Sequence, residues 1–276
     1  MRIKITVVLI VLAVLTSVFT GCSPNQENYL IEILKILPDD IIEVEYTGVE
    51  LMAEDPELVD IYHELIESFY GAWVYLLGLD FYDIHAIVGT SGLVIIKGDF
   101  DFQNVRDALS EFPEHEFVQD EYEGVEFWIG DPDSDEPLGI VFLEKLLVFG
   151  DVDYVKDTVR VSQKTEPSLY DNEDIKSVAD RLPSGIHVEI YTGEVVGDIP
   201  VLAGGRVLFN SVQGDEIINS QGWYRFESTA DAQAALPDLE DSYQWQYTHN
   251  IDAQLKGEFV EITGESMISI YTIPVS

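Results

Sequence analysis

The sequence predicts an α+β protein made of two related modules, each an antiparallel sheet covered by helices on one face. The segment 37–48 (LPDDIIEVEYTG) returns at 182–193 (LPSGIHVEIYTG), with Leu, Pro, Ile, Tyr, Thr and Gly matched without a gap. Short alternating apolar stretches also follow one another, separated by turns and by segments of helical periodicity, as in sheets covered by helices. We therefore expect an internal duplication.

Each copy of the repeated segment begins at the end of an amphipathic helix. Apolar residues recur at i, i+3, i+4 and i+7 before Pro38 and again before Pro183. Proline ends both helices because it has no backbone N–H to continue the hydrogen-bond ladder. We expect the first module to cover residues 28–166 and a second, shorter module to cover residues 167–276.

The remaining elements follow from the same patterns. In the first module we expect strands at 41–47, 84–88, 93–97, 125–129, 140–143 and 146–149, and helices at 56–77, 102–112 and 154–161. In the second we expect a turn at Gly204-Gly205, strands at 206–212, 222–226, 243–249, 258–262 and 267–273, and a helix after Phe226. The offset between matching residues falls from 145 (Leu37 to Leu182) to 130 (Asp101 to Asp231). The second module therefore lacks a counterpart of the aromatic helix at 56–77.

The N-terminus has the pattern of a targeting signal. Arg2 and Lys4 precede an uncharged apolar run from Ile5 to Phe19, which is shorter than the roughly 20 residues of a membrane-spanning helix. The run ends in Val18-Phe19-Thr20-Gly21-Cys22, which resembles the lipobox of bacterial lipoproteins. The resemblance implies a signal peptide over residues 1–21, a lipidated Cys22, a tether over 22–27, and a location in the cell envelope, membrane-anchored and facing outside the cytoplasm. The alternative is an uncleaved membrane anchor with an incidental cysteine.

A second resemblance concerns the folded part. Gly98-Asp99-Phe100-Asp101 precedes a predicted helix, and Tyr122, Gly124 and Val125 follow as Tyr-x-Gly-Val. These motifs resemble uncharacterised bacterial envelope lipoproteins built from duplicated α+β modules. The resemblance implies an architecture and supplies no activity.

The charge balance excludes one class of partner. The chain has 52 acidic and 14 basic side chains. Loss of residues 1–21 would remove two of the basic ones, leaving 12 against 52, a formal charge of −40. Such a surface repels nucleic acid. It favours a cationic or protein partner, or serves solubility alone.

Chemistry-bearing motifs are scarce. Cys22 is the only cysteine, so a lipidated chain has no thiol for a disulfide, for catalysis or for metal binding. His63-Glu64 begins like a zinc-protease helix, but Glu67 stands where the second histidine is required. No phosphate-binding Gly-Lys-Ser/Thr and no Ser-x-x-Lys occurs. We assign no catalytic residue and no cofactor, and expect a protein that is not an enzyme.

One acidic loop is a candidate metal site. Alternating carboxylates supply the hard oxygen ligands that calcium prefers. They lie between two predicted strands, at Asp131, Asp133, Asp135 and Glu136. The alternative is a solvated acidic turn.

Three functions remain open. The favoured one is a lipid-anchored extracytoplasmic protein with a non-enzymatic binding or assembly role. The second is a carrier of an apolar ligand, which requires a sizeable apolar cavity. The third is a hydrolase, which requires a pocket where a histidine and a carboxylate converge. Any specific function is expected around the aromatic helix or between the halves.

Overall fold

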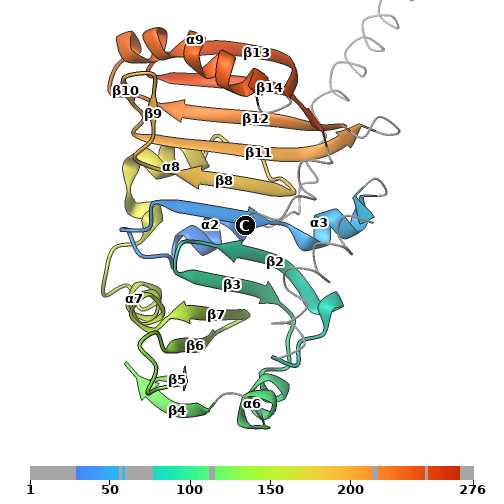
Figure 1. Cartoon of the computed structure of the whole chain (residues 1–276), viewed down its shortest axis with the longest axis vertical. Helices are drawn as coiled ribbons and strands as arrows, with labels where there is room; N and C mark the ends of the chain where they lie inside the picture. Colours follow the sequence, from blue (N-terminus) through green and yellow to red (C-terminus); the bar gives the residue numbers. More distant parts are fainter. Residues whose placement is uncertain are drawn as a thin grey trace, which may run out of the picture.

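A single antiparallel sheet of twelve strands runs through the chain (Figure 1). The computed structural model describes residues 29–55, 58–59, 77–111, 116–212, 217–245 and 248–267. The predicted signal peptide, Cys22 and most of the predicted aromatic helix lie outside the described residues. In the described ranges, no helix combines the length and the apolar character needed to cross a bilayer.

Among its described residues, the first half contributes seven strands and four α-helices. The strands are β1 (Glu43–Thr47), β2 (Ile84–Gly89), β3 (Leu93–Gly98), β4 (Phe117–Tyr122), β5 (Val125–Gly130), β6 (Leu138–Leu143) and β7 (Leu146–Asp151). The helices are α2 (Tyr29–Leu34), α3 (Val49–Glu54), α6 (Phe102–Glu111) and α7 (Val152–Ser162), with a 3-10 turn η2 (Phe81–Asp83).

The second half contributes five strands of the sheet and a separate hairpin. The strands are β8 (His187–Tyr191), β11 (Ala203–Val212), β12 (Ile217–Arg225), β13 (Thr248–Lys256) and β14 (Phe259–Met267), and β9 (Val195–Val196) with β10 (Ile199–Pro200) forms the hairpin. The helices are α8 (Glu173–Ala179) and α9 (Thr229–Trp245), with a 3-10 turn η3 (Leu169–Asp171).

The two halves meet through their repeated segments. The strand order is β13-β14-β12-β11-β8-β1-β2-β3-β7-β6-β5-β4, so β8 and β1 lie side by side where the halves join. They pair antiparallel from Glu43 opposite Tyr191 to Thr47 opposite His187. The strands of both predicted modules therefore form one mixed α and β structure with a continuous sheet.

Helices cover both faces of this sheet, whereas the sequence predicted helices on one face. Side chains alternate across a strand, so Ala86 and Val88 point to one side and Ile87 to the other. The first side packs against α2, α7 and α8, and we name it the α2 face. The opposite side packs against α3, α6 and α9, and we name it the α9 face. The prediction failed because apolar residues occupy both parities of the central strands, for example Ile95 and Ile96 of β3, both fully buried.

Residues that align in the two repeated segments do not lie on the same face of the sheet. Val44 and Tyr46 of β1 are buried on the α2 face. In β8 it is Val188 and Ile190 that lie on this face, and Tyr191 packs on the α9 face. A strand has a side-chain period of two, so a one-residue offset exchanges every side chain between faces. The two tyrosines therefore occupy different environments.

Four local predictions were wrong. The break expected between the strands at 258–262 and 267–273 is absent, because β14 runs without interruption from Phe259 to Met267. Gly204-Gly205 lies inside β11 and forms no turn. Glycine is needed at position 204 for a steric reason, because a Cβ there would come within 2.5 Å of the Tyr191 ring. Tyr243 belongs to α9, which continues past Pro237. Edge strand β4 was missed because its sequence FVQDEY is largely exposed and shows no apolar alternation.

Candidate functional site

A cavity of about 380 Å³ opens on the α9 face, where the two halves join. We name it the junction cavity. It is enclosed by β1, β8, β11 and β12 of the sheet, by α9 and by the β9–β10 hairpin. Its lining residues are Glu43, Glu45, Glu189, Tyr191, Glu194, Val195, Val196, Gly197, Arg206, Tyr224, Asp238, Leu239, Ser242 and Tyr243.

Carboxylates of both halves face one another across this cavity. Glu45 of β1 lies directly opposite Glu189 of β8 in the register of the sheet. Like charges at directly opposed positions destabilise a strand pair. Glu43, two residues before Glu45, lies on the same face. The strand pair that joins the halves therefore carries an electrostatic repulsion that a different sequence would avoid.

Arg206 supplies the positive charge of the cavity wall. It lies opposite Glu189 on the neighbouring strand β11. Its guanidinium carbon is 5.4 Å from the centre of the Tyr243 ring, within cation–π range, and its Nη2 donates to Ser266 Oγ at 2.5 Å. Within the described residues, Glu43, Glu45 and Asp238 form no ion pair. Five carboxylates thus line the cavity together with one guanidinium.

Three tyrosine hydroxyls form a chain that ends on Glu194. The hydroxyls of Tyr224 and Tyr243 are 2.6 Å apart, and both side chains are buried. Tyr224 is also hydrogen-bonded to Tyr191, and Tyr191 to Glu194. A carboxylate can only accept, so Tyr191 donates to Glu194 and the chain runs from Tyr243 toward Glu194. Burial raises the pKa of all three hydroxyls, which keeps them protonated as donors.

Glycines make room for these rings. A Cβ at Gly204 would lie 2.5 Å from the Tyr191 ring, and a Cβ at Gly222 would lie 2.2 Å from the Tyr243 hydroxyl. Tyr224 stands between the two rings, with its centroid 6.4 Å from that of Tyr191 and 6.1 Å from that of Tyr243. The glycines of β11 and β12 thus allow the three rings, which are inclined to one another, to pack close to the sheet.

The pKa values of two glutamates in the cavity are shifted in opposite directions. Burial raises the pKa of Glu194; the hydrogen bond from Tyr191 lowers it, but the charges of Glu43 and Glu189 raise it further. Burial also acts to raise the pKa of Glu189, yet the hydrogen bond and charge of His187 and the charge of Arg206 bring it below its usual range. Glu189 is thus balanced by His187 and Arg206, whereas Glu194 lies near the like charges of Glu43 and Glu189.

The β9–β10 hairpin forms one side of the opening. Its two strands form a separate two-stranded sheet and do not pair with the large sheet. The hairpin begins after Gly193, which has a φ of 79°. Its tip, Gly197, approaches α9 so closely that a Cβ would lie 2.4 Å from Asp238 Oδ2. Val195 is 60% exposed at the cavity rim. The hairpin adds apolar surface to an otherwise polar opening.

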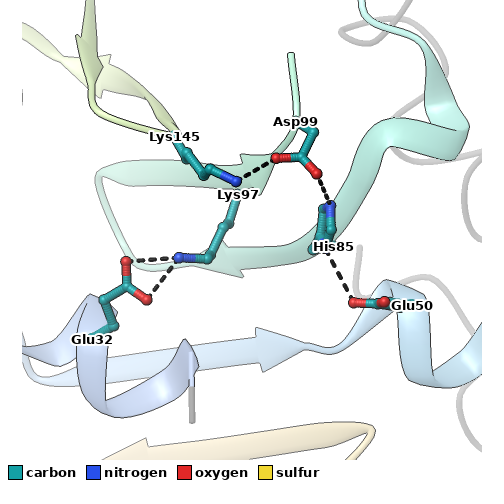
Figure 2. A network of polar contacts seen from close by, with 6 residues as sticks. All are labelled: Glu32, Glu50, His85, Lys97, Asp99 and Lys145. Atoms are coloured by element: carbon teal, nitrogen blue, oxygen red, sulfur yellow. Dashed lines mark hydrogen bonds and ion pairs between the residues drawn. The ribbon is translucent and has the colours of Figure 1, made fainter. Parts of the chain in front are cut away.

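A second hollow, of about 520 Å³, lies at one end of β2 and β3, and we name it the ion-pair pocket. Figure 2 shows its charged side chains alternating in sign. Lys97, with only 8% of its side chain exposed, donates to both oxygens of Glu32 at 2.6 and 2.7 Å. Its Nζ also lies 4.6 Å from the centre of the Tyr29 ring. This pair ties α2 to β3.

His85 forms the other part of this pocket and meets the geometric condition set for a hydrolase. Its Nδ1 lies 3.1 Å from Glu50 and its Nε2 lies 3.4 Å from Asp99 (Figure 2). A hydrogen bond from Lys145 lowers the pKa of Asp99, and the charges of Lys145 and His85 add to this. Both ring nitrogens are therefore occupied by carboxylates, and no serine, threonine or cysteine is among the described lining residues. The arrangement links α3 to the sheet and is poorly suited to activating a nucleophile.

The predicted calcium ligands lie in the loop between β5 and β6. Asp131 has a φ of 50° and accepts a backbone hydrogen bond from Glu116, while Asp133, Asp135 and Glu136 are exposed. In the part of the chain that the structure describes, no three acidic, histidine or cysteine side chains are grouped so as to hold a metal ion.

Sequence reasoning missed the junction cavity, although it pointed to the region between the halves. The available signal was the set of glutamates at alternate positions of β1, Glu43 and Glu45, with Glu189 in the second copy. Comparison of the chain with family models, curated proteins and solved structures finds no match.

Proposed function

We propose that this chain is a lipid-anchored extracytoplasmic protein that binds a small ligand in the junction cavity and catalyses no reaction. The observation that best supports this proposal is the cavity itself, because both halves contribute charged side chains to its walls. Ligands commonly bind in clefts where structural units meet. Cys22, seven residues before the start of α2, would hold the lipid and keep the cavity near the membrane surface.

We also infer that the two halves arose by duplication. A helix, a strand, a hairpin and a second helix follow one another as α2, β1, β2–β3 and α6, and again as α8, β8, β11–β12 and α9. The ends then differ, because β4–β7 complete the first half and β13–β14 the second. The equivalent strands lie on either side of the β1–β8 contact, which supports a common origin.

The carrier of an apolar ligand is the weaker alternative. The two hollows described above are lined mainly by charged side chains and tyrosines. An apolar ligand would leave these carboxylates desolvated without a partner, which costs free energy.

Native mass spectrometry of the protein isolated from the membranes of the cells that make it tests both parts of the proposal. We expect a lipid mass on Cys22 and a non-covalent small-molecule adduct on the released domain. Ser242→Trp, which fills the cavity, should abolish the adduct. Ser110→Trp on the exposed surface of α6 is the matched control and should retain it.

Absence of lipid on Cys22 would overturn the anchoring. Absence of any adduct on the wild-type chain, or an adduct that Ser242→Trp retains, would overturn binding in the junction cavity.

A further inference from the structure

We infer that the ligand of the junction cavity is an aliphatic polyamine, a molecule with two or more ammonium groups joined by short alkyl chains. This inference rests on the proposed function, because it names the chemical class that the cavity would take. It starts from a charge surplus and from the kind of surface that surrounds it.

The charge surplus calls for more than one cation. Of the five lining carboxylates, Glu189 lies opposite Arg206, and the hydrogen bond and charge of His187 together with the charge of Arg206 lower its pKa. Glu43, Glu45 and Asp238 have no ion pair within the described residues, and Glu194 only accepts from Tyr191. One ammonium group would leave most of this charge unbalanced.

The backbone register sets Glu45 opposite Glu189, and the side chains of Glu43 and Glu45 are exposed. Glu45 and Glu189 are held opposite each other by the pairing of β1 with β8. The pKa of Glu194 is raised by burial and further by Glu43 and Glu189. A bound cation would relieve both the repulsion and the raised pKa, since an opposite charge favours the ionised carboxylate.

The spacing suits ammonium groups on one chain. Residues two apart on a strand are separated by about 7 Å, which sets the distance between the backbone positions of Glu43 and Glu45. Glu194 and Asp238 bring further carboxylates from the hairpin and from α9. A flexible amine chain can present its charges to several of these groups at once.

The other walls suit the alkyl segments and the cationic heads. Val195 and Val196 add apolar surface at the rim, and the tyrosine rings line the interior. The position of Arg206 over the Tyr243 ring demonstrates that this aromatic wall accepts a cation. The cavity thus combines carboxylates, aromatic faces and aliphatic surface.

Isothermal titration calorimetry at low ionic strength tests the inference on the soluble domain, with spermidine, putrescine and butylamine as probes. We expect affinity to fall from the triamine to the monoamine, with spermidine at least tenfold tighter than butylamine. The double variant Glu43→Gln/Glu45→Gln should weaken spermidine binding at least tenfold. Glu45→Gln alone should weaken binding while raising the melting temperature, because it removes the repulsion with Glu189.

The matched control is Asp120→Asn/Glu121→Gln on edge strand β4. It removes the same number of negative charges, but at the far end of the sheet. It should change spermidine affinity less than twofold. Equal weakening by both double variants, or equal affinity for butylamine and spermidine, would overturn the inference. A neutral or anionic adduct that Ser242→Trp abolishes would overturn the polyamine and leave the proposed function standing, whereas no adduct at all would remove both.

Discussion

The junction cavity and the ion-pair pocket are both polar hollows, but they treat their charges differently. In the ion-pair pocket each cationic side chain lies within ion-pair distance of a carboxylate, as Lys97 does with Glu32 and Lys145 with Asp99. In the junction cavity five carboxylates accompany one arginine. Charges that satisfy one another hold elements of the fold together. Charges of one sign left facing a cavity are available to a ligand.

The comparison predicts the largest stability loss in the ion-pair pocket. Glu32→Gln leaves the buried Lys97 ammonium without its anion, and we expect the free energy of unfolding to fall by about 2 kcal/mol. The loss is smaller than for a fully buried pair because Glu32 is 46% exposed. Urea denaturation measures it. The double variant Glu32→Leu/Lys97→Met removes both charges and should recover most of the loss; a single variant as stable as wild type would refute the structural role.

A smaller loss is expected in the tyrosine chain. Tyr224→Phe removes the central hydroxyl and leaves that of Tyr243 buried without its acceptor, at a cost of about 1.5 kcal/mol. Tyr243→Phe removes only the first donor and should cost about 0.5 kcal/mol, because Tyr224 keeps its bond to Tyr191. Thermal denaturation of both variants checks the order. The reverse order would contradict the direction of the chain.

The smallest expected effects concern two glutamates whose contributions to the free energy of unfolding depend on pH in opposite directions. The raised pKa of Glu194 contributes stability below the ordinary glutamate pKa, and this contribution is lost as pH rises through the raised value. Glu194→Gln should therefore gain stability relative to wild type as pH rises. A hydrogen bond from Arg106 lowers the pKa of Glu126, so its contribution is present at neutral pH and lost as pH falls through the lowered value.

Glu126→Gln should accordingly be less stable than wild type at neutral pH, with the difference closing in acid. Urea denaturation of both variants between mildly acidic and neutral pH measures the two trends. If both variants followed the same trend with pH, the distinction between a surplus and a paired carboxylate would fail.

Local patterns predicted the first half of the fold well. Strands β2, β3, β5, β6 and β7 and helices α6 and α7 lie where apolar periodicity and turns placed them. These elements are defined by residues close together in the sequence. The continuity of the sheet was not predictable in this way, since it depends on the register of β1 against β8 across 140 positions.

The candidate site was harder to predict than the fold. Glu43 and Glu45 belong to no chemical motif in the sequence, and Tyr243 is predicted to lie in a strand. Only the placement of α9 over β12 brings Tyr243 to Tyr224, and only the β1–β8 register sets Glu45 against Glu189. The repeated segment supplies β1 and β8, which form the boundary between the halves. The repeat and the junction are one place.

The β1–β8 contact also bears on how the chain folds. Thr47 and His187 lie 140 positions apart, and pairing over such separations slows folding. Until His187–Tyr191 arrives, β1 has only β2 as a neighbour and presents an open strand edge. Charged side chains on an open edge hinder pairing with other chains and so oppose aggregation. Glu43 and Glu45, which repel a partner strand in the finished sheet, would protect this edge during the slowest step of assembly.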